Sequence, residues 1–474
     1  MDFQFFALLG AGLIVALEVA AVIFAFRAIG YSRTPQGAVA WVVFLILAPF
    51  IAVAAYLFLG QSRIHGYTIA RQKSQAVIDG VALAVEEYRP RGDGGALNYR
   101  AFEQIAELPV LSGNAMELLV DGEESFDAIF AAIDGAESYV LVQFYILRDD
   151  ALGQDLAKRL LAARKRDVSV RVLYDSIGCS RLPATYVDEL KSAGIEVYDS
   201  NALRGPTKRF QINFRNHRKT VVVDGKTGFT GGHNVGVEYL GQDPKFGHWR
   251  DTHVMLHGPV VLQLQLVFVE DWHWATNADI LGELSWQVTP APQNMDAVLL
   301  ASGPADRLDA GTYYFLAAIA AAKSRIWIAS PYFVPPEEVR AALCLAALRG
   351  VEVRILVPDE MDHYTPWHAA FAYFDELRAC GAEIWRYQGG FLHQKVLLVD
   401  DSIASVGTIN LDNRSCRLNF EATALFFDTD AARDVADMLE TDFLNAYRLE
   451  KTITQQPWRI RYMAPIARLF SPLL

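Results

Sequence analysis

The sequence predicts a mixed α/β protein. Two tandem α/β domains, each a mixed sheet flanked by helices, are expected to form one cleft with pseudo-twofold symmetry, preceded by a hairpin of two membrane helices. Three observations predict this fold: a polar motif occurs twice at a fixed offset, strand and helix patterns alternate in both halves, and the first 60 residues contain two long apolar runs. A chain of 474 residues is long enough for two or three domains with large cores.

The two apolar runs cover residues 5–26 and 38–59, 22 residues each. A helix needs about 20 residues to cross a hydrocarbon core of about 30 Å, so each run is long enough to span a membrane. A cleaved signal peptide fits the first run poorly, because its start is not basic and a second run follows. We therefore expect a hairpin whose link, residues 27–37, lies on one side of the membrane and the remaining chain on the other. Pro49 is expected only to kink the second helix.

A polar connector, residues 61–108, separates these helices from two domains expected at 109–285 and 286–474. The hydrophobic pattern predicts strand 139–147, helix 152–164 and strand 168–174 in the first domain, and helix 313–322, strand 325–328, helix 337–348 and strand 351–357 in the second. Such alternation is typical of layered α/β domains. We expect the two domains face to face, with the active site in the cleft between them.

The repeated motif combines His, Lys, Asp and Asn. Its first copy reads NHRKTVVVD at 216–224 and GGHN at 231–234, and its second reads HQKVLLVD at 393–400 and GTIN at 407–410. The His, Lys, Asp and Asn of the two copies are each separated by the same 176 positions. A fixed offset over four residue types indicates an internal duplication.

This motif suits a phosphodiester substrate. His217 and Lys219 are two apart at the start of a β-branched run that predicts a strand, so both point to one face, and His393 and Lys395 repeat this geometry. Lysine and asparagine side chains can hold anionic phosphate oxygens, while one imidazole attacks phosphorus and the other gives a proton to the leaving alkoxide. The candidate residues are His217, Lys219, Asn234, His393, Lys395 and Asn410.

Asp224 and Asp400 complete the motif but are too distant to orient the histidines. Seven residues of strand span about 23 Å at roughly 3.3 Å per residue. Both aspartates are expected to fix the hairpin turn or a neighbouring ion pair. They stay among the candidate site residues as members of the motif.

The duplicated motif resembles the His-x-Lys-x-x-x-x-Asp motif of the phospholipase D superfamily, and within it the chain is most similar to bacterial cardiolipin synthases. The segments that carry the second resemblance are 144–146, 173–178, 249–253, 331–335, 407–415 and 467–474. The resemblance implies a phosphatidyltransferase, without cofactor or metal, that joins two molecules of phosphatidylglycerol into cardiolipin through a phosphatidyl-histidine. It also implies a multi-pass protein of the inner membrane with cytoplasmic catalytic domains.

Several choices stay open at this point. His217 is taken as the nucleophile and His393 as the proton donor, but the motif is compatible with the reverse order. Water, serine or an ethanolamine lipid could replace the second phosphatidylglycerol as acceptor, and a non-catalytic lipid-binding scaffold is the alternative of another class. The oligomeric state is also open.

The superfamily places a carboxylate beside each histidine, on a later strand. By this resemblance we assign Asp251 to His217 and Glu421 to His393. The alternatives are buried ion pairs of these carboxylates with Arg250 and Arg417, and Glu238 as a weaker rival.

Charge argues against a nucleic-acid substrate. The net charge is −12, whereas a protein that neutralises many phosphates carries a basic face. The segment 203–219 is a local exception, with six basic and no acidic residues, and it could recognise anionic lipid headgroups or form a solvated loop. The four cysteines have no paired spacing, so neither disulfides nor a zinc site are expected.

The C-terminal segment, residues 458–474, mixes arginines with aromatic and aliphatic residues. Two interpretations are equally compatible with this pattern. The segment could pack onto the core, or it could lie on the bilayer as an interfacial helix.

Overall fold

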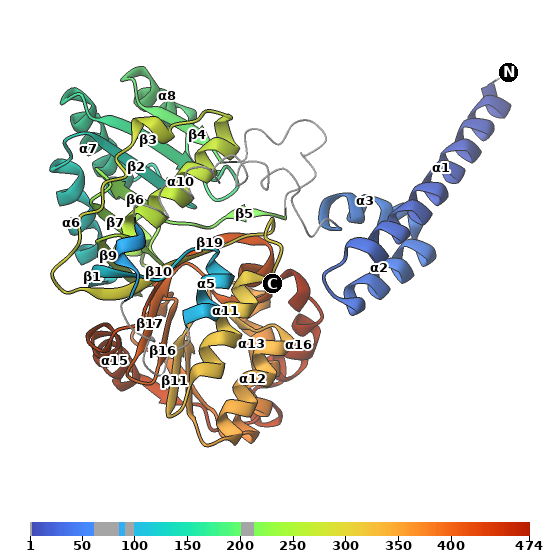
Figure 1. Cartoon of the computed structure of the whole chain (residues 1–474). Helices are drawn as coiled ribbons and strands as arrows, with labels where there is room; N and C mark the ends of the chain where they lie inside the picture. The colour runs from blue at the N-terminus through green and yellow to red at the C-terminus, as the bar shows by residue number, and fades with distance from the viewer. Residues whose placement is uncertain (1, 61–84, 91–98, 201–212) are drawn as a thin grey trace.

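The computed structural model describes residues 2–60, 85–90, 99–200 and 213–474. Figure 1 shows two α/β lobes in contact and a helical arm, α1 to α3, that projects from them. The upper lobe contains the first half of the catalytic part, and the lower lobe the second. The mixed α/β fold class predicted from the sequence is confirmed.

One continuous sheet runs through both lobes. Its two central strands, β1 (Leu111–Val120) and β10 (Met295–Ser302), pair antiparallel with Leu111 opposite Ala297. Outward from β1 follow β9 (Thr252–His257), β7 (Thr227–Gly231), β6 (Thr220–Val223), β2 (Tyr139–Phe144), β3 (Ser169–Tyr174) and β4 (Glu196–Asp199). Outward from β10 follow β19 (Asn419–Phe426), β17 (Ile403–Gly407), β16 (Val396–Val399), β11 (Arg325–Ala329), β13 (Glu352–Pro358), β14 (Glu383–Tyr387) and β20 (Ala446–Arg448).

The strand order is the same on both sides of the β1–β10 seam, apart from the additional β20, as expected for a duplication. The halves therefore meet at the edges of their sheets, where β1 pairs with β10. The edge strand of each half is hydrogen-bonded to that of the other, so neither sheet ends at the domain boundary.

Helices cover both faces of the sheet. The first half contributes α6 (Asp121–Asp134), α7 (Ala151–Lys165), α8 (Ala184–Ser192) and α10 (Val260–Thr276), while α5 (Tyr99–Ala106), which precedes β1, packs against β10 and α11 of the second half. The second contributes α11 (Ala310–Ala321), α12 (Glu337–Leu348), α13 (Tyr364–Ala379), α14 (Asn413–Arg417), α15 (Thr429–Leu444) and α16 (Trp458–Arg468). The strands and helices predicted at 139–174 and 313–357 all occur, with ends shifted by three residues at most.

The described residues form three large hydrophobic cores between these layers, and one of the three belongs to both halves. It joins Val254 and Phe268 of the first half to Leu398 and Leu439 of the second. Burial of apolar surface contributes about 25 cal/mol per Å² to stability, so a core shared by both halves links them strongly. The two motif copies are thereby held in a fixed relation.

The membrane arm differs from the predicted pair of spans. The first run forms one long helix, α1 (Asp2–Tyr31), whose stretch Gly10–Tyr31 is long and apolar enough to cross a membrane. The second run is divided into α2 (Pro35–Leu47) and α3 (Pro49–Leu59), because Ala48 leaves the helical region at φ −139° and ψ 58°. Pro49 has no N–H and disfavours helix at the preceding residue, so it ends α2 where the sequence predicted a kink. In the described part of the chain, only α1 is long enough to span.

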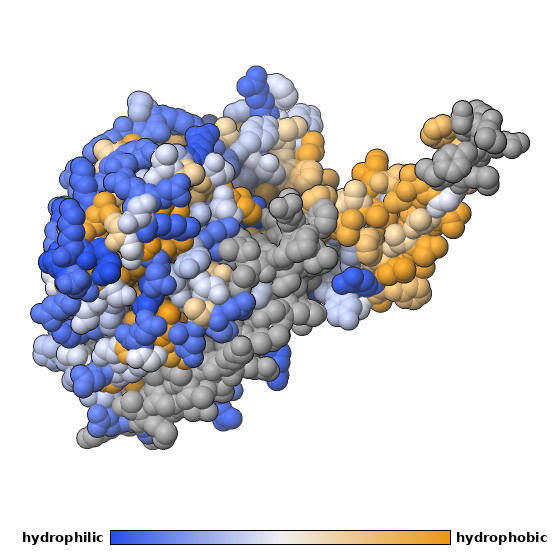
Figure 2. Space-filling view, turned by 90° about the horizontal axis from the view of Figure 1, so that it is seen from above, coloured by the Kyte–Doolittle hydropathy of each residue, from blue (hydrophilic) through white to orange (hydrophobic). Residues whose placement is uncertain are grey.

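The three helices pack around aromatic side chains. Tyr56 of α3 stacks on Phe24 of α1 and meets Trp41 of α2 edge-on, with ring centroids 5.0 Å apart in both pairs. Elsewhere the arm exposes apolar side chains, and Figure 2 shows it as an orange projection from a predominantly blue body. Such a surface is typical of a segment surrounded by lipid.

The turn between α1 and α2 touches the second half of the catalytic part. Arg33 forms an ion pair with Asp309, just before α11, and its Nη2 donates to the Pro304 carbonyl at 3.1 Å. The sequence had placed this link across the membrane from the remaining chain. The structure instead places Arg33 against the catalytic part.

Candidate active site

Each histidine of the motif follows a two-residue strand that pairs with a strand of the other half. β5 (Arg215–Asn216) pairs in parallel with the start of β19, and His217 N donates to the Phe420 carbonyl at 2.9 Å. β15 (Phe391–Leu392) pairs in parallel with β8 (Trp249–Arg250), and His393 N donates to the Arg250 carbonyl at 2.8 Å. His217 and Lys219 thus precede β6 itself, where the sequence predicted them on that strand.

This pairing crosses the carboxylates between the halves. His217 Nδ1 lies 2.8 Å from Glu421 Oε2, and His393 Nδ1 lies 2.7 Å from Asp251 Oδ2. The assignment of Asp251 to His217 and of Glu421 to His393 was therefore wrong. The reason is the register of the short strands, since each carboxylate directly follows the residue whose carbonyl accepts from the opposite histidine.

Both carboxylates are held in place by further donors. Glu421 accepts hydrogen bonds from Thr408 Oγ1 at 2.6 Å and from Asn419 Nδ2 at 3.1 Å. Asp251 accepts from the Thr252 N–H at 2.8 Å. A Cβ at position 232 would lie 1.8 Å from Asp251 Oδ1, so glycine at this position leaves the space that the carboxylate occupies.

Burial sets the protonation of the two imidazoles. It lowers the pKa of His217, opposed by the charge of Glu421, and it lowers the pKa of His393 well below its usual value, assisted by Lys395. Lys395 Nζ lies 2.8 Å from His393 Nδ1, which cannot accept from lysine while it donates to Asp251. We therefore infer that Nδ1 carries a proton and donates it to the carboxylate, which is the shorter of the two contacts of His393 Nδ1. In the neutral form of each ring, Nε2 is then the nitrogen that can accept a proton or attack a substrate.

Each lysine of the motif lies beside its histidine. Lys219 and Lys395 donate to the carbonyls of His217 and His393, two residues before them. Burial lowers the pKa of Lys219 to about 7 and that of Lys395 to about 8, and the charge of Lys395 contributes to the shift of Lys219. The charges of each motif copy therefore act on the other copy, as expected if both copies face one site.

The two asparagines are not equivalent. Asn234 Oδ1 accepts from the Ile146 N–H at 3.0 Å and its Nδ2 donates to Tyr239 Oη at 2.9 Å. The buried Oδ1 of Asn410 has no hydrogen-bond partner among the described residues. Asn234 therefore fixes the loop after β2, and Asn410 is the better placed of the two to meet a substrate.

Asp224 and Asp400 lie at the turns, where the distance argument put them. Asp224 accepts from the backbone N–H groups of residues 137, 138 and 139 at 2.8–2.9 Å, and Asp400 does the same for residues 323, 324 and 325. Both have left-handed backbone, with φ 54° and 50°. They tie the β6–β7 and β16–β17 hairpins to the starts of β2 and β11.

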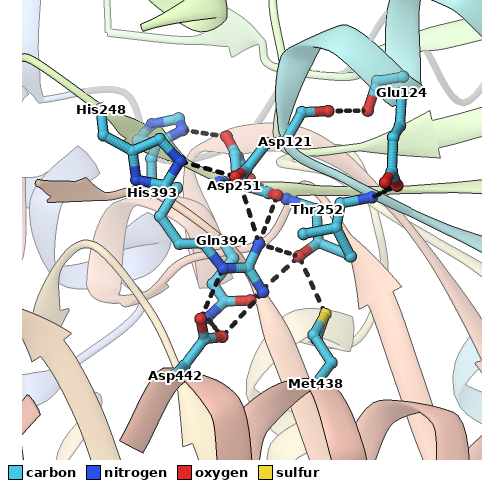
Figure 3. A network of polar contacts seen from close by, with 12 residues as sticks. Asp121, Glu124, His248, Asp251, Thr252, His393, Gln394, Met438 and Asp442 are labelled. Carbon is cyan, nitrogen blue, oxygen red and sulfur yellow. Dashed lines mark hydrogen bonds and ion pairs between the residues drawn. The ribbon is translucent and has the colours of Figure 1, made fainter. Parts of the chain in front are cut away.

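A polar network that was not predicted supports the His393 side of the site (Figure 3). Arg250, next to Asp251, forms a bidentate ion pair with Asp442 of α15, in which Nε and Nη2 donate to the two carboxylate oxygens at 2.6 and 2.8 Å. Its Nη1 donates to Asp121 Oδ1 at 3.3 Å. Asp442 also accepts from Gln394 at 2.7 Å. Arg250 thus does not pair with the Asp251 carboxylate, the alternative considered from the sequence.

The first half has a matching network around Asp271 of α10. Its carboxylate accepts from Arg218 Nη1 at 2.7 Å, Asn216 Nδ2 at 2.9 Å and Gln143 Nε2 at 2.7 Å. Arg218 is buried by these contacts, so it cannot serve in recognition of lipid headgroups. The basic residues 204, 208 and 209 of that segment lie outside the described residues.

Aromatic rings enclose the histidines. Tyr145 meets His217 edge-on at 5.1 Å between centroids, and Trp249 lies 5.1 Å from His393. Among the described residues, no group of three or more His, Cys, Asp or Glu side chains is placed to hold a metal ion. The pocket therefore offers two buried imidazoles with oriented carboxylates, two cations and an amide, which is suited to attack on an anionic phosphorus centre.

Comparison with known proteins agrees with this chemistry. The family model described as cardiolipin synthase, PLD-like domain, matches residues 129–268 and 315–443, one segment in each half. The chain belongs to the phospholipase D-like cardiolipin synthase family. A second model, phospholipase D-nuclease N-terminal, matches residues 19–61 of the arm.

Curated members of the cardiolipin synthase family match over nearly the whole chain. Cardiolipin synthase A of Pseudomonas aeruginosa is 44% identical, covering 98% of this chain and 96% of that protein. Cardiolipin synthase A of Pseudomonas fluorescens is also 44% identical and covers 98% of each. The chain is thus an enzyme of the phospholipid transferase type.

A solved structure supports the fold. Phosphatidylserine synthase of Haemophilus influenzae superposes with a TM-score of 0.60 at 17% identity, covering 79% of this chain and 99% of that chain. At this identity the likeness concerns the arrangement of the two α/β halves.

Proposed function

We propose that the protein transfers a phosphatidyl group between two molecules of phosphatidylglycerol, giving cardiolipin and glycerol. The observation that carries the proposal is the pair of buried histidines, each bonded through Nδ1 to a carboxylate of the opposite half. Two equivalent imidazoles suit a reaction in two similar steps, in which one forms a bond to phosphorus and the other moves a proton.

In the first step His217 Nε2 attacks the phosphorus of phosphatidylglycerol. The P–N bond forms and the bond from phosphorus to the glycerol headgroup oxygen breaks. His393 enters this step as an imidazolium, protonated on both nitrogens and supported by Asp251 and the anionic phosphodiester, and it gives its Nε2 proton to that oxygen. Glycerol leaves and a phosphatidyl-histidine remains. Glu421 supports the positive charge that develops on His217, as the carboxylate partner of a histidine does in other enzymes.

In the second step His393 acts as a base. It takes the proton from the 1-hydroxyl of a second phosphatidylglycerol, whose oxygen attacks phosphorus and displaces His217 Nε2. Lys219, Lys395 and Asn410 hold the phosphate oxygens through both steps. Because one phosphodiester replaces another, the reaction is expected to be close to thermoneutral and to run backwards with added glycerol.

Low solvent access favours a lipid acceptor over water. His217 and His393 are 9% and 7% exposed, and rings of Tyr145 and Trp249 lie against them. A site that excludes water protects the phosphatidyl-enzyme from hydrolysis. This observation weighs against a phospholipase D, which would need water at the same position.

We place the reaction at the inner membrane, with the catalytic halves on the cytoplasmic side and α1 as a spanning helix. The multi-pass arrangement stays a prediction, since it requires α2 and α3 to cross together. The contact of Arg33 with Asp309 favours an arrangement in which α2 and α3 enter and leave on the catalytic side.

The test is product analysis with purified protein in vesicles that contain phosphatidylglycerol alone. We expect cardiolipin and glycerol in equal amounts, and neither product from His217→Ala or His393→Ala. Phosphatidic acid as the main product would show that water is the acceptor. Absence of turnover with every phospholipid donor would favour the non-catalytic scaffold.

A further inference from the structure

The C-terminal helix α16 carries a row of large hydrophobic side chains on its outer face. Trp458, Tyr462 and Ile466 follow one another at helical spacing and are 67%, 59% and 49% exposed. Leu469 and Phe470 continue the row, at 78% and 51%. Residues four apart lie on the same face of a helix, so these five side chains form one stripe, which we call the tail stripe.

The opposite face of α16 packs on the second half of the catalytic part. Ala464 and Ala467 are buried in the core of the second half, and Ser471 Oγ hydrogen-bonds Tyr373 Oη of α13 at 2.7 Å. Packing against the core is therefore complete without the tail stripe. The two interpretations of this segment thus apply to its two different faces.

The charge beside the tail stripe is positive. The segment from Trp458 to Leu474 contains Arg459, Arg461 and Arg468 and no acidic residue, in a chain of net charge −12. Arg459 lies over the Trp458 ring at 5.5 Å and Arg461 over the Tyr462 ring at 5.7 Å. Apolar and aromatic side chains flanked by arginine are typical of helices that lie in the interface of an anionic bilayer.

The tail contacts the short helix α14, and α14 shares an ion-pair partner, Asp309, with the membrane arm. Arg414 of α14 donates through its N–H to the Leu474 carbonyl at 2.6 Å, and Arg417 contacts Asp309, the partner of Arg33 in the arm. Figure 1 shows α16 and the C-terminus on the side of the lower lobe from which the arm projects. α16 therefore lies on the side of the catalytic body from which the arm projects.

The same helix leads to the active site. Arg414 also donates to the Asn213 carbonyl at 2.6 Å, three residues before Asn216 of the first motif copy. Burial lowers the pKa of Arg414, and Glu421, the partner of His217, is among the charges that act on it. Contact of the tail with a membrane would thus be made close to the pocket that must receive lipid.

We propose that the tail stripe is a second membrane contact, in which α16 lies in the headgroup region of an anionic bilayer and holds the mouth of the site against the lipid surface. The proposal rests on the membrane location proposed above and not on the identity of the reaction. It commits the exposed face of α16 to lipid. A second copy of the chain is the competing occupant.

The test places a fluorescent probe on the tail stripe of the full-length protein. Ile466→Cys in a Cys380→Ser background is labelled with an environment-sensitive NBD dye, since the remaining native cysteines are buried. Lys158→Cys on α7 is the control, because this side chain is 72% exposed and outside the tail. Both proteins are reconstituted in phosphatidylcholine vesicles with and without phosphatidylglycerol, and nitroxide-bearing acyl chains serve as quenchers.

We expect the probe at 466 to emit at shorter wavelength and to be quenched several-fold more strongly than the probe at 158, most of all with phosphatidylglycerol present. Equal quenching at both positions would overturn the proposal. A short-wavelength emission without quenching by the lipid nitroxides would also overturn it and assign the tail stripe to a contact between copies. Neither readout needs turnover, so the result is independent of the proposed reaction.

Discussion

Exchange of each carboxylate for its amide distinguishes the crossed pairing from the uncrossed one. In Asp251→Asn the amide can keep the hydrogen bond from the Thr252 N–H and present its NH₂ group to His393 Nδ1. This reverses the polarity of the contact and opposes protonation of the ring. In Glu421→Gln the same change falls on His217.

The size of the effect follows from the contacts. Each pair is a buried, charge-assisted hydrogen bond of 2.7 or 2.8 Å, and a bond of this kind contributes about 1.5–3 kcal/mol, or roughly 10- to 150-fold in rate. The wrong tautomer adds to this loss, since the corresponding change in a serine protease triad costs about 10⁴. We expect kcat to fall by about 10²–10⁴ in either variant, with near-normal KM.

The assay separates the two histidines by their roles. A phosphatidyl ester of nitrophenol has a leaving group that needs no proton, so the first step no longer depends on the proton donor. Release of nitrophenol in a single turnover should recover in His393→Ala and in Asp251→Asn. It should not recover in His217→Ala or Glu421→Gln.

The comparison does not depend on which histidine is the nucleophile. If the roles are reversed, His217→Ala and Glu421→Gln recover together. Recovery of His393→Ala together with Glu421→Gln, and not with Asp251→Asn, would refute the crossed pairing.

Three further predictions concern pH, the network and the arm. Lys219 and Lys395 are charged below their pKa values of about 7 and about 8 and lose this charge above them. The value of kcat/KM for the anionic lipid should therefore fall as pH rises through this range. A pH–rate profile at low substrate concentration measures this fall. Asp442→Asn leaves the buried Arg250 guanidinium short of its main partner, which should cost about 3 kcal/mol and lower the thermal unfolding temperature by roughly 3–4 °C in a protein of this size. Arg250→Met combined with Asp442→Leu should cost less, and equal losses would contradict this. Ser32→Cys, next to Arg33, should react with an impermeant maleimide only from the side that carries the catalytic part, and reaction only from the opposite face would show that the link crosses the membrane.

The sequence was sufficient for the features that local patterns encode. The alternation of apolar residues located the strands and helices of both halves, and the fixed offset of the motif identified the duplication. The distance along a strand was enough to exclude Asp224 and Asp400 as residues that orient the histidines. Each of these inferences depends on residues that are close in sequence.

Contacts between the halves could not be predicted from such local patterns. The partner of His217 is set by the pairing of β5 with β19, two strands about 200 residues apart, and two residues carry too little periodicity to be recognised as a strand. The pairing of Arg250 with Asp442 could not be predicted for the same reason. Pro49 was visible, but whether a proline kinks or ends a helix depends on tertiary packing, here that of Tyr56 against α1 and α2.

The seam between β1 and β10 bears on how such a protein can fold and be divided. Separated from the other half, β1 and β10 would lose their pairing at Leu111–Asn114 and Met295–Ala297, and the core that both halves share would be exposed. Unpaired strand edges and exposed apolar surface both promote association with other chains, and natural proteins avoid them. The covalent link between the halves therefore supplies each edge with its partner during synthesis, so either half produced alone should aggregate unless the other half is made together with it.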